Sequence, residues 1–233
     1  MNAQPDNNTG DVDGVVTLDA AVTGFKSALR SMESAHKPLL MLRCKVVLVG
    51  DACVGKSALV QMFHGGGQRY PKNYVMTTGV GFCVKQVNIP DTNCAVELYL
   101  FDCAGQSIFN QREQNLKSWE NTSYVVVVYD VGNRDSFQSC AKWLQGVRST
   151  RQSSMIPGVL VANKSDLREG GINSRAAVSD EEGRNFAQEN SLEFFETSAA
   201  EAKNVDAPFN FIASQFHQKY EQTVQRAEAL SGY

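Results

Sequence analysis

A glycine-rich stretch followed by lysine and serine contains residue types that bind phosphate. The pattern is glycine, any four residues, glycine, lysine and serine, and it comprises Gly50, Asp51, Ala52, Cys53, Val54, Gly55, Lys56 and Ser57, with Ala58 next. Backbone N–H groups of such a loop, with the N-terminus of a following helix, form a concave anion site. We expect Lys56 to reach phosphate oxygens and the Ser57 hydroxyl to ligate Mg²⁺. An accidental match is disfavoured, because an apolar run precedes the loop and a helical stretch follows it.

A second acidic element follows the apolar run Val96–Phe101. A carboxylate at the end of a strand can hold Mg²⁺, usually through water, and Asp102 occupies that position. The N–H of Gly105 can approach a terminal phosphate because no side chain intervenes. We expect Gln106 to orient an attacking water. Asp130 also ends an apolar run, but no Gly-Gln pair follows it, so we expect a structural role there.

The residues Asn163, Lys164, Ser165 and Asp166 follow another apolar run and could recognise a base. An aspartate can accept from both N1–H and N2–H₂ of guanine, whereas adenine offers the opposite pattern, so this pairing rejects adenine. Ligands bind at the carboxyl edge of a parallel sheet, where this tetrapeptide would lie. We therefore expect Asn163, Lys164 and Asp166 to bind guanine. This expectation argues against an ATP-dependent phosphotransferase built on the same loop.

Two further segments could complete the site. The backbone N–H near Ala199, between Ser198 and Ala200, could donate to the guanine oxygen, although a polar strand-to-helix turn explains this pattern equally well. In the irregular loop 64–78, Thr77 could close over Mg²⁺ and the γ-phosphate, with Tyr70 and Tyr74 upstream. Long loops in compact domains are usually functional, and a plain surface loop is the alternative.

The elements that must position these residues alternate along the chain. Strand-length apolar runs occur at Val46–Val49, Val80–Val87, Val96–Phe101, Tyr124–Tyr129, Val159–Ala162 and Leu192–Phe195. Helical patterns lie at Lys56–Phe63, Ser107–Ser118, Ser136–Ser149, Asp180–Asn190 and Val205–Ala229. Alternating strands and helices imply right-handed crossovers. The sequence predicts an α/β fold, a single doubly wound, mostly parallel six-stranded sheet with helices on both faces.

Composition excludes several other classes. The 233 residues have a net charge of −3 and no basic cluster, so we expect no nucleic-acid partner. No apolar stretch approaches the roughly 18 residues of a membrane span, and the N-terminus has no signal-peptide pattern. Six scattered cysteines without a C-x-x-C pair argue against a zinc site or a disulfide framework. We predict a flexible N-terminal extension at residues 1–38 and one domain, ending in a long helix, at residues 39–230.

In this order the motifs resemble those of the Ras superfamily of small GTPases, over residues 43–220. The resemblance implies a switch that binds GTP or GDP with Mg²⁺, with Ser57, Thr77 and Asp102 as metal ligands. It implies that Gln106, Lys56 and Thr77 are the catalytic residues. It also places Tyr70 at the aromatic position that edges the guanine.

Several stretches outside the nucleotide motifs are similar to the Rab-like small GTPases of intraflagellar transport complex B. They are Met76–Gly79, Ile89–Thr92, Val96–Leu98, Val159–Lys164 and Asp206–Phe209. This resemblance implies a heterodimer with the small β-sandwich subunit of that complex, further protein partners, and a place in the cilium or flagellum. The missing signal-peptide pattern leads us to expect a cytoplasmic protein. Because position 2 is Asn2 and no cysteine follows Cys140, we expect no lipid anchor.

Three departures from the superfamily pattern affect the expected rates. Ala52 and Cys53 stand where many members have glycine, and their bulk should slow hydrolysis. Ala200 replaces the usual lysine, which should loosen guanine binding slightly. The leading hypothesis is a GTP-regulated switch with slow hydrolysis. The alternatives are a constitutive, nucleotide-stabilised interaction subunit and a vesicle-traffic Rab-type GTPase.

Overall fold

The computed structural model describes residues 40–68, 70, 71, 73, 75–105, 117–150, 155–169 and 174–231. The predicted extension at residues 1–38 lies outside these ranges. So does nearly all of the predicted helix Ser107–Ser118, and so do Tyr74 and Gln106.

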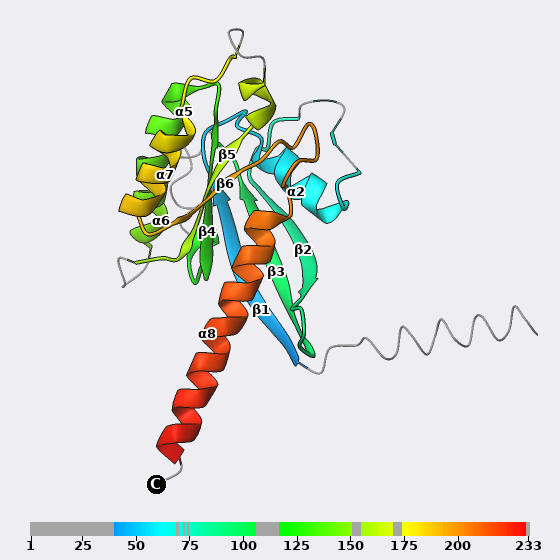
Figure 1. The fold of residues 1–233 in the computed structure, drawn as a ribbon, viewed down its shortest axis with the longest axis vertical. Coiled ribbons are helices and arrows are strands. Elements are labelled where there is room, and N and C mark those ends of the chain that lie inside the picture. Colours follow the sequence, from blue (N-terminus) through cyan, green and yellow to red (C-terminus); the bar gives the residue numbers. More distant parts are fainter. Residues whose placement is uncertain are drawn as a thin grey trace, which may run out of the picture. The chain divides into compact units, whose positions relative to one another are not determined.

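Within the described residues, six strands form one sheet (Figure 1). They are β1 Leu40–Val49, β2 Val80–Asn88, β3 Cys94–Cys103, β4 Tyr124–Asp130, β5 Gly158–Asn163 and β6 Glu193–Glu196. Their order is β2-β3-β1-β4-β5-β6; β2 pairs antiparallel with β3 and every other pair is parallel. The predicted doubly wound, mostly parallel sheet is confirmed. Since β1 lies between β3 and β4, the chain reverses its winding direction at the carboxyl end of β1, where ligands bind in such sheets.

Strand β1 begins six residues before the predicted Val46. Its first part alternates between exposed and buried side chains, with Arg43 exposed and Cys44 buried, and it pairs with β3 alone. From Val46 onward β1 also pairs with β4, and the remaining residues to Val49 are all buried. In the sequence, only this second part of β1, which is buried on both faces of the sheet, forms a continuous apolar run.

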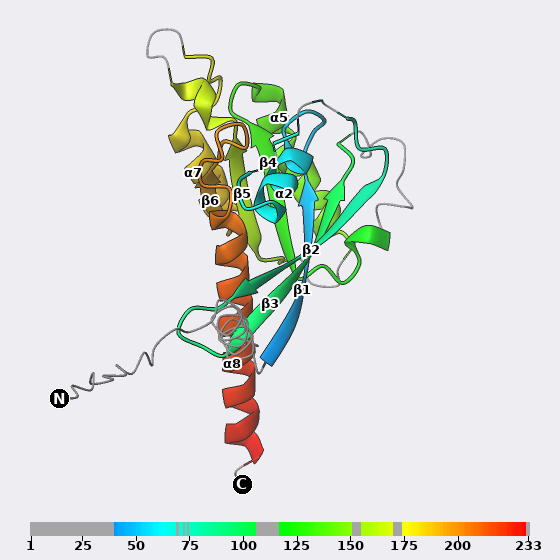
Figure 2. The same ribbon diagram turned by 90° about the vertical axis from the view of Figure 1, so that its right-hand side faces the viewer.

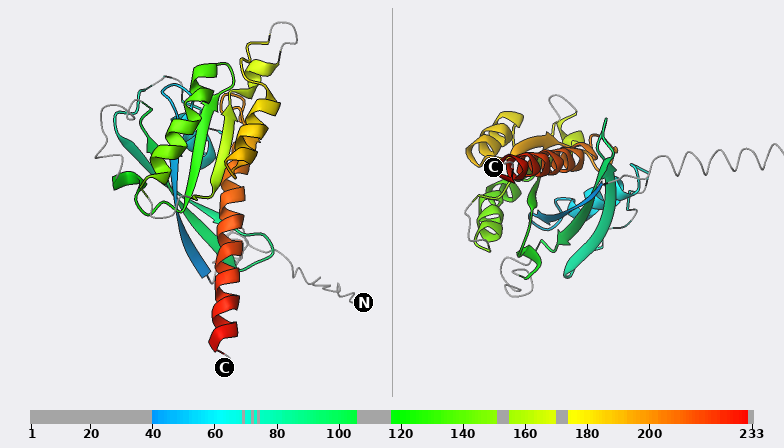
Figure 3. Two further views of the ribbon diagram at one scale, coloured as in Figure 1. Left: turned by 90° about the vertical axis from the view of Figure 1, so that its left-hand side faces the viewer. Right: turned by 90° about the horizontal axis from the view of Figure 1, so that it is seen from below.

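Helices cover both faces of the sheet, as Figures 2 and 3 show from the sides and from below. The helices that lie fully within the described residues are α2 Lys56–His64, α5 Arg134–Gln138, α6 Cys140–Arg148, α7 Asp180–Glu189 and α8 Ala207–Ser231, with a 3₁₀ turn at Ser165–Arg168. One buried cluster packs α2 and α8 against the sheet, and a second cluster packs α5, α6 and α7 on the opposite face. The buried part of α8 ends at His217, and the remainder of the helix extends beyond the sheet (Figure 1).

The predicted helix Ser136–Ser149 is two helices, α5 and α6. It begins two residues early because the Asn133 side chain accepts from Ser136 N and caps the helix. Ser139, between the two, keeps helical φ and ψ values of −70° and −17°, and no contact explains the interruption. Among the described residues, no helix is both long and apolar enough to cross a membrane.

Candidate nucleotide site

The phosphate-loop pattern connects β1 to α2 and lies close to β5. Gly55 has φ 99°, and a Cβ atom there would lie 2.2 Å from Nδ2 of Asn163. Only glycine tolerates both this conformation and this approach. Asn163 Nδ2 in turn donates to Val54 O at 2.8 Å, so the last residue of β5 fixes the position of the phosphate loop.

Lys56 begins α2 with its side chain buried at 6% exposure. Its Nζ donates to the carbonyl oxygens of Gly50 and Asp51, both at 2.8 Å. Burial lowers the pKa of Lys56, while the nearby Asp102 carboxylate acts in the opposite direction. A buried ammonium held by carbonyls alone gains further stabilisation from an anion, which suits a phosphate ligand.

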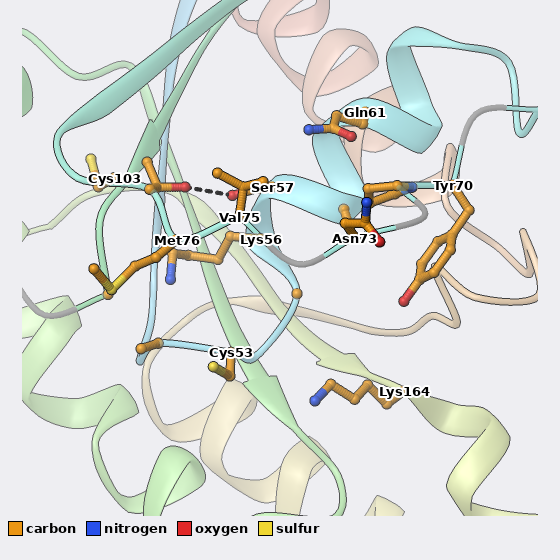
Figure 4. Close-up of a pocket in the computed structure, with 16 residues that line it drawn as sticks. Cys53, Lys56, Ser57, Gln61, Tyr70, Asn73, Val75, Met76, Cys103 and Lys164 are labelled. Atoms are coloured by element: carbon orange, nitrogen blue, oxygen red, sulfur yellow. Dashed lines mark hydrogen bonds between the residues drawn. The ribbon is translucent and has the colours of Figure 1, made fainter.

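Three oxygen-bearing side chains converge beside the lysine. Ser57 Oγ donates to Asp102 Oδ2 at 2.5 Å. It also lies 2.9 Å from Thr77 Oγ1, the contact that the dashed line in Figure 4 marks. Within the described part of the chain, Asp102 Oδ1 is buried without a hydrogen-bond partner, and burial raises the pKa of this carboxyl. Hard oxygen ligands around an unpaired carboxylate atom fit Mg²⁺, which would supply the missing positive charge.

The segment that follows β3 packs directly on the phosphate loop. A Cβ atom on Gly105 would lie 2.2 Å from Ala52 N and 2.4 Å from Asp51 C, so only glycine fits. This contact brings the predicted second motif to the phosphate loop. The next residue of that motif, Gln106, lies outside the described residues, so its predicted placement stays a prediction.

At the other end of the site, the Asn163 side chain connects the phosphate loop to the segment that follows β6. It is 1% exposed, and besides Val54 O it contacts Thr197 and Ala199. Its Oδ1 accepts from Thr197 Oγ1 at 3.0 Å and from Ala199 N at 3.3 Å. The Ala199 N–H that the sequence offered to a guanine oxygen therefore has a partner inside the protein.

Lys164 and Asp166 are each held by a residue from another segment. Lys164 adopts the left-handed conformation (φ 63°), and its Nζ donates to Asp130 Oδ2 at 2.6 Å. Asp130 also accepts from Gly132 N at 2.8 Å, which gives it the structural role expected from the sequence. Ser198 Oγ donates to Asp166 Oδ1 at 2.5 Å.

A cavity of about 640 Å³ lies between the phosphate loop and Lys164, and its volume is within the size range of small-molecule sites. Of the residues predicted to bind nucleotide, those that line it are Ala52, Cys53, Gly55, Lys56, Ser57, Ala58, Tyr70, Thr77, Gly105 and Lys164. Those outside its wall are Gly50, Asp51, Val54, Asn163, Asp166, Ser198, Ala199 and Ala200. Figure 4 shows Lys56, Cys53 and Lys164 around the hollow, with Tyr70 at one side.

The cavity wall also contains residues that the sequence analysis missed. They are Gln61, Pro71, Asn73, Val75, Met76 and Cys103. Helical periodicity could have indicated Gln61, which lies one turn after Ser57 on α2. Cys103 directly follows Asp102 at the end of β3, so the acidic motif could have indicated it. No local pattern marks Pro71, Asn73, Val75 and Met76, because the loop 65–79 has no regular period.

Comparisons with known proteins agree with this geometry. Residues 45–218 match the Ras family. The chain is 43% identical over 193 residues to the intraflagellar transport protein 27 homolog of Homo sapiens, covering 83% of this chain and all of that protein. It is 42% identical to intraflagellar transport protein 27 of Chlamydomonas reinhardtii (78% of this chain, 88% of that protein). It is 37% identical to Ras-related protein Rab-2B of Dictyostelium discoideum (76% and 82%). The chain therefore belongs to the Ras family, and it is a small GTPase that binds GTP or GDP with Mg²⁺.

Proposed function

We propose that this GTPase is a Rab-like subunit of the intraflagellar transport B complex and binds its protein partners according to the bound nucleotide. Relatives named intraflagellar transport protein 27 come from a mammal, an alga and a trypanosome, and the chain covers 88% or more of each of them. Such coverage supports a shared role in the cilium or flagellum. The heterodimer with the small β-sandwich subunit is part of this proposal.

One observation carries the site assignment: Ser57, which contacts Thr77, donates to Oδ2 of Asp102, while Oδ1 of the same carboxylate is buried without a partner among the described residues. We assign these three side chains to Mg²⁺ and Lys56 to the phosphates. Bound Mg²⁺ neutralises phosphate charge. Asp166, oriented by Ser198, is assigned to the guanine edge.

Slow hydrolysis is part of the same proposal. Ala52 and Cys53 both line the cavity, and their side chains occupy space that glycine would leave open. We assign the orientation of water to Gln106. Replacing Gln106 by leucine should depress the single-turnover hydrolysis rate about tenfold or more while sparing nucleotide binding. An unaltered rate would remove Gln106 from the mechanism.

The decisive experiment compares partner affinity in two nucleotide states. The protein is loaded with a non-hydrolysable GTP analogue or with GDP, and binding to the purified β-sandwich subunit and to the assembled complex is measured by calorimetry. A difference above about tenfold, or 1.4 kcal/mol, supports a switch. Equal affinities would make the chain a constitutive subunit whose fold the nucleotide stabilises. Absence of binding in both states would favour the vesicle-traffic alternative.

A further inference from the structure

The two tryptophans of the chain lie together behind the phosphate end of the site, and neither lines the cavity. Trp143 on α6 and Trp119 are both buried, and their ring centroids are 6.4 Å apart in an edge-to-face arrangement. Trp143 Nε1 donates to Asp51 Oδ1 at 2.7 Å, whereas Trp119 Nε1 donates to Cys103 Sγ at 3.4 Å. Each indole N–H thus contacts a different phosphate-side motif.

Asp51 connects Trp143 to the groups assigned to the phosphates. Its carboxylate accepts the indole hydrogen, while its backbone carbonyl accepts from Lys56 Nζ at 2.8 Å. The peptide between Asp51 and Ala52 is also the surface on which Gly105 packs. The orientation of this one residue therefore affects both the lysine ammonium and the glycine segment.

The carboxylate of Asp51 carries a negative charge within a loop that receives anions. If it turned toward the ligand, its negative charge would repel the phosphates. The hydrogen bond from Trp143 is charge-assisted and short, and it holds the carboxylate against α6. In keeping with this, Asp51 is absent from the cavity wall.

We propose that Trp143 is a positioning residue for nucleotide binding. Its hydrogen bond to Asp51 orients the Asp51 carbonyl oxygen, which accepts from Lys56, and keeps the Asp51 carboxylate turned away from the phosphates. This inference rests on the proposed roles of Lys56 and the phosphate loop.

The test replaces each tryptophan by phenylalanine and follows release of a directly excited fluorescent GDP analogue with Mg²⁺ present. Trp143→Phe keeps an aromatic ring but removes the N–H, and should speed release about five- to tenfold. Trp119→Phe is the matched control: it also removes an indole N–H from the same ring pair, and should change release less than twofold. Thermal unfolding of both variants measures the loss of packing.

A double-mutant cycle separates positioning from packing. In an Asp51→Ala background the carboxylate is gone, so adding Trp143→Phe should change GDP release less than twofold. If Trp143→Phe does not fold, Asp51→Asn and Asp51→Ala replace it. The amide oxygen can still accept the indole hydrogen, so Asp51→Asn should release GDP at least about threefold more slowly than Asp51→Ala.

Each result decides the proposal. The proposal is wrong if the two tryptophan variants release GDP at equal rates, or if Trp143→Phe has its full effect in the Asp51→Ala background. In either case GDP binding by the wild-type protein would still support the proposed function. Equal rates for Asp51→Asn and Asp51→Ala would overturn the proposal in the same way. A wild-type protein that binds no guanine nucleotide would remove both.

Discussion

At the base end of the site the side chains of Asn163, Lys164 and Asp166 are each paired with a residue from another segment, and among the described residues only the Ser165 hydroxyl there is buried without a partner. At the phosphate end, by contrast, the atom without a partner in the described structure is an oxygen of a buried carboxylate. Asn163 uses both ends of its amide within the protein, and Lys164 is paired with Asp130. Among the described residues, by contrast, Asp102 Oδ1 is buried and unpaired, and the hydrogen-bond partners of Lys56 Nζ are the carbonyl oxygens of Gly50 and Asp51.

This difference indicates two ways of binding one ligand. Side chains that are held by partners, as Asn163, Lys164 and Asp166 are, are preorganised and discriminate between ligands at little cost. A region with a buried unpaired oxygen is completed only by its cation and phosphates. We infer that the base end sets specificity and that the phosphate end makes affinity depend on phosphate and metal.

The largest expected effect is at the phosphate end. Lys56→Ala removes the buried ammonium and its charge-assisted bonds to phosphate, so GDP affinity should fall about 100-fold or more. Calorimetry with Mg²⁺ measures the loss. Lys142→Ala, at an exposed position on α6, makes the same change away from the site. An unchanged affinity in Lys56→Ala would remove the phosphate assignment.

The next effect should be confined to the base end. Asp166→Asn presents an amide in place of the second carboxylate oxygen, which leaves guanine donors unpaired, so the preference for GDP over ADP should shrink about 100-fold. Competition between the two nucleotides measures this preference. Asp135→Asn, exposed on α5, is the control. If both nucleotides weakened equally, the two ends would not be independent.

A smaller effect should follow from loosening the support of Lys164. Asp130→Asn retains an acceptor for Gly132 N and removes only the charge that pairs with Lys164. Because the lysine is partly exposed, GDP release should accelerate only about threefold. Stopped-flow release of labelled GDP checks this value. A rate equal to that of the wild type would mean that the pair does not position Lys164.

The smallest expected effect is on the stability of the protein at low pH, and it involves the contact between α5 and α7. Hydrogen bonds from Arg134, and then from Ser179, lower the pKa of Glu182 from 4.5 to about 2. Because the folded-state pKa is lowered, the stabilisation is present above pH 4.5 and is lost as pH falls from 4.5 toward about 2. Urea denaturation midpoints over that range should decline less in Glu182→Gln than in the wild type, and Glu181→Gln is the neighbouring control. A change in GDP affinity at neutral pH would show that these helices influence the site.

Much of the fold was predictable because its signals are local. The six strands and the start of α2 were found from short apolar runs and from the pattern that ends at Ser57. The first part of β1 was missed, since it pairs on one side only and its burial alternates. Helix α5 began early because of a capping side chain that the apolar pattern does not reveal.

The sequence by itself determined which residue types meet phosphate, metal and base, because each motif is a contiguous segment between a strand and a helix. Only the tertiary structure decided what holds those segments in place: Asn163 reaches Val54 across 109 positions, and Trp143 reaches Asp51 across 92. Local periodicity contains no information about partners so distant. Such contacts form only when the sheet brings the strand ends together and burial requires each polar group to find a partner.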